Sequence, residues 1–143
     1  MNKKIIIIPI IIIAVISIEY LSQDSPEEKI DDVFHITLAS SDLYANGVYA
    51  DTFDINKGDY YFRFVPNGSS PKILSIILNG ENFDFSENFK LHSTAHQTGV
   101  SEYFTWDYQG EEKFSISEKQ KISIIIDPNG NTMGSVSVDI IKN

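Results

Sequence analysis

The sequence predicts an all-β protein, in which a single antiparallel β-sandwich of jelly-roll-like arrangement follows a hydrophobic N-terminal segment. Three observations support this fold class. Apolar and polar residues alternate with a period of two along most of the chain after Phe34, which is typical of strands with one buried face. Turn-forming dipeptides separate these stretches roughly every 8–12 residues. After residue 33, the sequence contains no apolar stripe with the period of a helix.

The N-terminal segment, residues 1–21, bears on the compartment in which the protein resides. Lys3 and Lys4 precede an apolar run, Ile5–Ile18, that is interrupted only by Pro9 and Ser17. A short basic start followed by an apolar core is the layout of a secretory signal peptide. A transmembrane helix, in comparison, needs about 20 apolar residues to cross the hydrocarbon core of a bilayer.

The length of this segment leaves alternatives open, because Tyr20 and Leu21 extend it beyond Glu19. It fits a cleaved signal peptide, or a retained anchor that holds the chain to the membrane through Ile5–Leu21; a buried hydrophobic strand or helix is a third interpretation. Basic flanking residues stay in the cytoplasm. We therefore expect a cytoplasmic N-terminus and an extracytoplasmic remainder, either membrane-anchored or secreted.

The rest of the chain divides into an acidic linker, residues 22–32, and a β-sandwich domain, residues 33–143. The linker is polar and reads as a stalk. About 120 residues after the leader correspond to one domain, which is large enough to be stabilised by its own core.

Nine stretches have the alternation expected of strands, each with one apolar and one mainly polar face. Ile122, Ile124 and Ile126 give the clearest example. Asn-Gly and related dipeptides lie between the stretches and supply the positive φ angles of tight turns. The predicted strands are residues 34–39, 48–55, 60–65, 73–78, 83–86, 103–108, 113–116, 122–127 and 136–141.

Charge and composition exclude several classes of function. The chain has a net charge of −9, and without residues 1–21 it retains nine basic and nineteen acidic residues, a net charge of −10. An acidic domain repels phosphate backbones, so nucleic acid is not an expected partner. The absence of cysteine removes disulfides, thiol nucleophiles and cysteine-ligated metal centres.

Residues 53–64, Phe-Asp-Ile-Asn-Lys-Gly-Asp-Tyr-Tyr-Phe-Arg-Phe, form a strand, a tight turn at Gly58 and an aromatic strand. This pattern resembles small extracytoplasmic β-sandwich domains of the Golgi-dynamics and pre-peptidase C-terminal type, and residues 122–141 look like their final hairpin. The resemblance implies a non-catalytic binding or accessory domain.

Three histidines are candidate ligands for a transition metal such as copper or zinc. His92 and His96 would share one face if they lay on a helix, although residues 91–99 have the pattern of a loop. His35 projects from the polar face of its predicted strand and could join them. Solvent-exposed histidines without a ligand are the alternative.

Two groups of acidic and amide residues are candidate ligands for calcium. Residues 127–131, Asp-Pro-Asn-Gly-Asn, imitate the start of a calcium loop, but the glycine and the terminal acidic ligand are missing from their positions, so a hairpin turn is favoured. Asp51, Asp54 and Asp59 could converge as oxygen ligands at one end of the sandwich, or form ordinary acidic surface.

The aromatic strands separate predicted core residues from predicted ligand contacts. Phe62, Phe64, Phe104 and Trp106 are expected in the core, and Trp106 is expected at its buried centre, in phase with Phe104 and Tyr108. The opposite faces carry Tyr61, Arg63 and Tyr103, residue types that are enriched at protein contacts and sugar platforms.

Asn67-Gly68-Ser69 is a glycosylation sequon in a predicted turn. Motifs for nucleophilic, metalloprotease or phosphate chemistry are missing from the sequence. The first hypothesis is therefore a non-enzymatic domain that binds a protein or a cell-surface polymer. A metal-binding domain and a structural subunit of an envelope or membrane complex are the alternatives.

Overall fold

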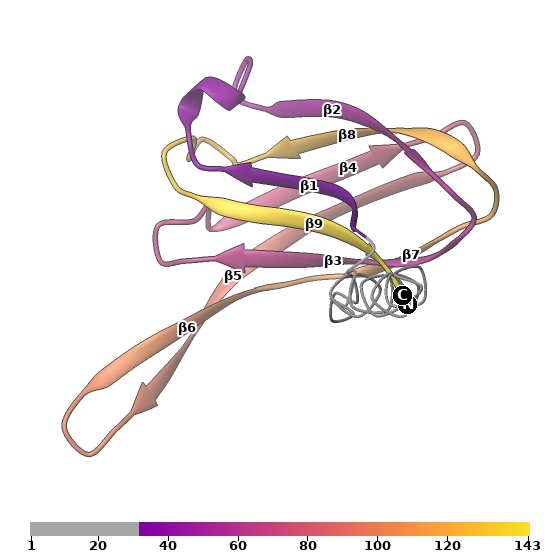
Figure 1. The fold of residues 1–143 in the computed structure, drawn as a ribbon. Coiled ribbons are helices and arrows are strands. Elements are labelled where there is room, and N and C mark those ends of the chain that lie inside the picture. Colours follow the sequence, from indigo (N-terminus) through magenta and orange to yellow (C-terminus); the bar gives the residue numbers. More distant parts are fainter. Residues whose placement is uncertain (1–31) are drawn as a thin grey trace, which may run out of the picture. The chain divides into compact units, whose positions relative to one another are not determined.

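The computed structural model describes residues 32–143. The predicted signal or anchor, residues 1–21, and nearly all of the linker lie outside the described residues. Residues 32–143 are built from strands in two antiparallel sheets (Figure 1), which confirms the predicted all-β sandwich. In this part of the chain, no helix is long and apolar enough to cross a membrane.

All nine predicted strands are present, and a single 3₁₀ turn (Ser41–Leu43) lies between the first two. Every strand end lies within two residues of the prediction, except the end of β5, which lies at residue 97 and not at residue 86. The strands are β1 (Asp32–Leu38), β2 (Tyr49–Ile55), β3 (Gly58–Pro66), β4 (Ile73–Asn79), β5 (Asp84–Gln97), β6 (Glu102–Gln109), β7 (Lys113–Ile116), β8 (Gln120–Asp127) and β9 (Val136–Lys142).

The order of the strands is that of a jelly roll. One sheet has the order β1-β9-β3-β7 and the other β2-β8-β4-β5-β6. When β6 is set aside, the other eight strands pair first with last: β1 with β9, β2 with β8, β3 with β7 and β4 with β5. This is the pairing of an eight-stranded ribbon rolled into two sheets. β6 is an additional strand beside β5.

The core lies between the two sheets and follows from the alternation in each strand. Ile122, Ile124 and Ile126 of β8 are fully buried, as their period of two predicts. Phe62 of β3 faces Phe89 of β5, with ring centroids 5.5 Å apart. Burial of such side chains, about 1.5–3 kcal/mol each, is the main favourable contribution to folding.

The predicted turns also form. Asn46 and Gly47 have positive φ angles of 53° and 83° and connect the bridged pair Ala45 and Val48. Asn129 and Gly130 have φ angles of 51° and 91°. Asn-Gly sequences adopt this left-handed conformation readily, so residues 127–131 form a turn as predicted. The turn connects β8 to β9, which belong to different sheets and do not pair, so the expected hairpin of residues 122–141 is wrong.

The hairpin of β5 and β6 differs from the prediction, because residues 91–97, expected in a loop, are part of β5. The last residue of β5 that pairs with β4 is Lys90, opposite Ile73, while the pairing with β6 continues to Gln97. The hairpin therefore projects beyond the rest of its sheet (Figure 1). We call residues 91–106, its projecting part, the arm.

The arm also overturns the predicted position of Trp106. Tyr108 is buried, but Phe104 is 53% exposed and Trp106 is half-buried and lies outside the core cluster. A Cβ atom added to Gly68 would lie 3.1 Å from Cζ2 of Trp106, so the indole packs against that turn. The phase along β6 is as expected, but the opposite sheet does not extend over the arm.

Candidate functional site

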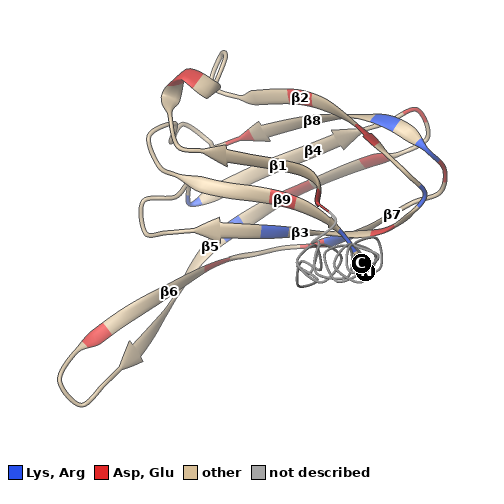
Figure 2. Cartoon of the chain, in the orientation of Figure 1, with Lys and Arg blue, Asp and Glu red and all other residues tan. Residues whose placement is uncertain are grey.

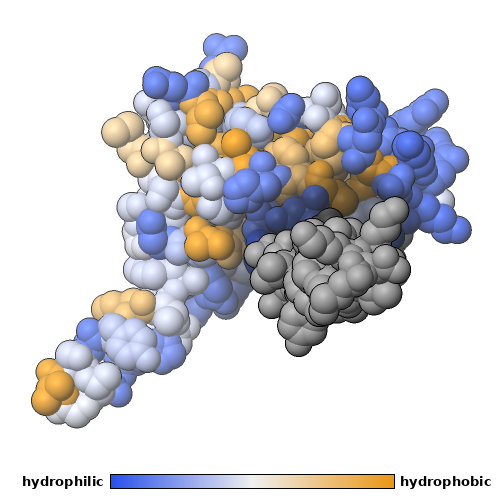
Figure 3. All heavy atoms as spheres, viewed as in Figure 1, coloured by the Kyte–Doolittle hydropathy of each residue, from blue (hydrophilic) through white to orange (hydrophobic). Residues whose placement is uncertain are grey.

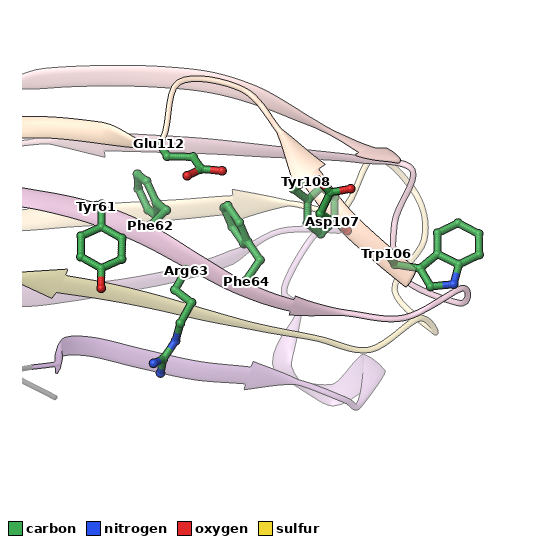
Figure 4. A pocket seen from close by; sticks show the side chains of 8 residues that line it. All are labelled: Tyr61, Phe62, Arg63, Phe64, Trp106, Asp107, Tyr108 and Glu112. Atoms are coloured by element: carbon green, nitrogen blue, oxygen red, sulfur yellow. The ribbon is translucent and has the colours of Figure 1, made fainter. Parts of the chain in front are cut away.

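A cleft of about 270 Å³ opens between β3 and β6 at the edge of the sandwich (Figure 4). Residues of β3, of β6 and of the segment before β7 surround it. Its lining residues are Tyr61, Phe62, Arg63, Phe64, Trp106, Asp107, Tyr108 and Glu112.

The cleft is open because β7 is much shorter than β3. β7 pairs only with residues Gly58–Tyr61 of β3, and one further bond joins the Phe62 N–H to the Glu112 carbonyl at 2.9 Å. Backbone groups alternate in direction along a strand, so the N–H and C=O of Phe64 point out of the same edge as those of Phe62. No strand within residues 32–143 pairs with that edge at Phe64.

The floor of the cleft is aromatic and its rim is acidic. Phe64 packs on Tyr108 with ring centroids 5.2 Å apart. The Tyr108 hydroxyl donates to the Pro71 carbonyl at 2.6 Å, and burial raises the pKa of this tyrosine. Asp107 and Glu112 are exposed at the rim. The cleft therefore offers an apolar surface, two carboxylates and an unpaired strand edge.

Arg63 points away from Phe62 and Phe64, toward the outer face of its sheet (Figure 4). There its Nε and Nη2 donate to Oδ2 of Asp139 at 2.9 and 2.7 Å. His35 Nδ1 contacts the other carboxylate oxygen. The Asp139 side chain is 2% exposed. Its hydrogen bonds raise the pKa of Arg63, so the guanidinium that we predicted as a ligand contact is held by a buried carboxylate.

The three predicted ligand residues do not form one surface. Tyr61 and Arg63 both lie on β3 and line the cleft. Tyr103 lies on the arm, where it is 51% exposed and stacks on His96 with a centroid distance of 4.9 Å. The periodicity placed each residue on the correct strand, but the length of the hairpin separates Tyr103 from the other two.

The histidines are also separated. His35 belongs to β1, in the first sheet, and contacts Asp139. His92 and His96 lie on one face of β5, about 13 Å apart at 3.3 Å per residue; His96 bonds to the Thr105 hydroxyl at 2.9 Å. Across residues 32–143, no three His, Asp or Glu side chains lie close enough together to hold a metal ion.

The carboxylates considered for calcium have local partners. Asp51 accepts hydrogen bonds from the Tyr49 hydroxyl at 3.0 Å and from the Thr52 N–H at 2.8 Å. Asp59 accepts one from the Ser115 hydroxyl at 2.6 Å. In the part of the chain that is described, neither belongs to a metal-binding cluster.

Comparison with known proteins gives no further guidance. No protein-family model, curated protein or solved structure matches this chain. The resemblance of residues 53–64 to extracytoplasmic β-sandwich domains thus rests on their local pattern alone.

The sequon residue Asn67 is exposed in the turn after β3. Its Nδ2 donates to the Ser135 hydroxyl at 2.9 Å, and its Oδ1 accepts from the Ser69 N–H at 2.8 Å. The amide that would carry a glycan is therefore part of the contact between two turns. Glycosylation of Asn67 stays a prediction.

Sequence reasoning missed Asp107, Glu112 and Asp139. A signal for the cleft was present, because the four-residue strand 113–116 is too short to cover the aromatic strand before it. A signal for the buried carboxylate was also present, since Asp139 is the one charged residue among the first six of β9. Buried charges are expected to be paired.

Proposed function

We propose that this chain is a non-catalytic, extracytoplasmic binding module that holds an extended segment of a partner protein in the cleft between β3 and β6. The observation that carries this proposal is the unpaired edge of β3 at Phe64 above an aromatic floor. An extended peptide recognises such an edge by adding a strand, and its main-chain hydrogen bonds supply affinity independent of sequence.

The surroundings of the edge specify the chemistry of the peptide. Alternate side chains of an added strand point to opposite faces. Those directed inward would meet Phe64 and Tyr108, which favours apolar residues. Asp107 and Glu112 at the rim favour Lys or Arg, and the net charge of −9 would speed the association of a basic segment.

The location is the second part of the proposal and rests on residues 1–21. A basic start and an apolar run support delivery across a membrane. A domain that is retained there by an anchor, or secreted, would meet its partner on the outer side. A tag at the C-terminus should then be accessible to protease in intact cells, and protection of that tag would contradict this location.

The binding proposal is tested with the purified full-length chain and a library of extended basic-apolar peptides. Binding should protect the Phe64 amide from hydrogen exchange, and backbone N-methylation of the peptide at alternate residues should abolish binding. Glu112→Lys should weaken binding about ten-fold, or about 1.4 kcal/mol. Glu81→Lys, the same charge change at an exposed residue outside the cleft, is the matched control. Protection confined to other strands would overturn the proposal.

A cell-surface glycan is the second candidate, and the half-buried position of Trp106 at the cleft favours it. Aromatic faces beside carboxylates suit sugar rings, which present apolar C–H faces and hydroxyl groups. Glycan binding would change Trp106 emission without protecting the Phe64 amide. The metal-binding and envelope hypotheses stay predictions.

A further inference from the structure

We propose that the free edge of β6 in the arm is a contact with a second copy of this chain, formed by antiparallel pairing of the two β6 strands about a two-fold axis. The contact uses the distal part of β6, around Phe104. It does not depend on the partner proposed for the cleft.

The backbone of β6 is arranged for such pairing. β6 is the last strand of its sheet. The Thr98 N–H donates to the Ser101 carbonyl at 2.8 Å, which makes these two residues a hydrogen-bonded pair at the hairpin end. Because the direction of backbone groups alternates, the N–H and C=O of Phe104 and Trp106 point to the side of β6 away from β5.

This edge has few of the features that normally protect an exposed strand. Natural edges carry charged side chains, especially lysine, as well as proline, bulges or short strands, and β6 has only Glu102 and Asp107. β6 has the sequence Glu-Tyr-Phe-Thr-Trp-Asp-Tyr-Gln, without lysine, proline or glycine. Tyr103 and Phe104 are 51% and 53% exposed. Figure 3 shows hydrophobic surface at the tip of the arm, where Val100 is 99% exposed. A strand of this composition is expected to be covered by another strand.

The low charge of the arm makes it the part of the chain where a second copy meets the least electrostatic repulsion. The chain has a net charge of −9, so two copies repel each other when their bodies approach. The arm carries few charged residues (Figure 2): Glu102 lies within it, and Asp107 lies at its base, opposite His92. Residues 91–97 extend β5 by about 23 Å beyond its pairing with β4, compared with a screening length of about 8 Å at physiological salt. Contact between arms thus keeps the acidic bodies separated.

Pairing of two identical strands is self-complementary. An antiparallel pair about a two-fold axis brings the same residues of both copies together and closes the assembly as a dimer. With the axis at Phe104, Tyr103 of one copy lies opposite Thr105 of the other. The contact is small by the standard of stable interfaces, so we expect it to depend on concentration.

Single cysteines test this pairing cleanly, because the natural chain has none. Full-length chains with Tyr103→Cys or Thr105→Cys are oxidised mildly, each alone and as a mixture. At least one combination should give a disulfide dimer, because the Cα atoms of paired residues lie about 4.5–5.5 Å apart. Thr94→Cys is the matched control. Thr94 pairs with Thr105 within the hairpin and is also exposed, but between copies it would lie about 16 Å from its counterpart.

Phe104→Lys gives a second readout. It should reduce the cross-linked fraction at least about ten-fold and leave the melting temperature unchanged, since Phe104 lies outside the core. The proposal is overturned if the β6 cysteines cross-link no more than Thr94→Cys, or if Phe104→Lys has no effect. Cross-linking exclusively to a different protein would also overturn it and would assign the arm to that protein.

Discussion

Arg63→Ala should destabilise the fold more than Asp139→Asn, although both substitutions break the same ion pair. The reason is the difference in burial. The Asp139 side chain is 2% exposed, whereas those of Arg63 and His35 are 40% and 55% exposed. Removing Arg63 leaves a buried carboxylate short of partners, while neutralising Asp139 leaves Arg63 and His35, two side chains that water reaches.

The magnitudes follow from the contacts. Arg63→Ala removes two hydrogen bonds, 2.9 and 2.7 Å long, and leaves His35 as the remaining side-chain partner of Asp139. Loss of one partner of a buried pair costs about 3–5 kcal/mol. We expect about 3 kcal/mol, the low end, because water enters the space left by Arg63. Asp139→Asn retains an acceptor for Arg63 and should cost about 1–2 kcal/mol.

Urea unfolding of the full chain, followed by far-ultraviolet circular dichroism, measures both costs. Lys113→Ala, at an exposed residue of the neighbouring strand β7, is the control and should change the free energy of unfolding by less than about 0.5 kcal/mol. The double variant should cost at least about 1 kcal/mol less than the two single costs combined. Equal single costs, or additive ones, would refute the reasoning from burial.

Three further predictions concern stability. Burial raises the pKa of Tyr108 above its ordinary value of 10.0. Above about pH 10, the folded state therefore keeps a proton on Tyr108 that the unfolded state releases. The free energy of unfolding should fall as the pH rises through this range. Urea titrations at several pH values should show a smaller fall for Tyr108→Phe. A Cβ on Gly134 would lie 1.9 Å from the Ser69 carbonyl oxygen, so Gly134→Ala should cost about 1–3 kcal/mol or more; Gly99→Ala, which meets nothing within 4 Å, should be nearly neutral in the same assay. Trp106→Ala should lower the free energy of unfolding by less than about 3 kcal/mol, the lower limit for a buried tryptophan. Acrylamide should partially quench the tryptophan fluorescence of the wild-type chain. Full resistance to quenching would contradict the half-buried position of Trp106.

The strands and their inward faces were predictable because alternation is a local property. Ile122, Ile124 and Ile126 are fully buried, as their spacing requires. The turns at Asn46-Gly47 and Asn129-Gly130 were predictable for the same reason, since positive φ angles depend on the residue itself. Short, uncrossed connections limit the topologies open to nine strands in two sheets. The order of the strands, and with it the jelly-roll pairing, depends on contacts between distant strands that local alternation does not report.

The position of Trp106 was not predictable from its phase. Alternation shows that Phe104, Trp106 and Tyr108 share a face, which is correct, but not whether another sheet covers that face. Of the three, only Tyr108 is buried. The length of β5 was hidden as well, because residues 92–97 lack a strong apolar alternation. Their pairing with β6 is a tertiary property that polar residues permit without predicting.

The contact of Asp139 with Arg63 and His35 depends on register. Asp139 lies directly opposite His35 on β1 and Arg63 on β3, residues that are 104 and 76 positions away in the sequence. In the sequence, these are three charged or polar residues on three separate strands. Only the alignment of β9 between β1 and β3 places them on one line, and a register shift of one residue would put them on opposite faces.

The additional strand explains both candidate surfaces. Eight strands suffice for the jelly roll, and β6 lies in the sequence between β5 and β7, which belong to opposite sheets. The chain must run out along β5, return along β6 and then cross to β7, where only Lys113–Ile116 remain to pair with β3. The insertion that extends one sheet into the arm thus leaves the other sheet without a neighbour beside Phe64. The arm and the cleft are therefore two consequences of one feature of the chain, and variants that shorten β6 should be designed with both surfaces in mind.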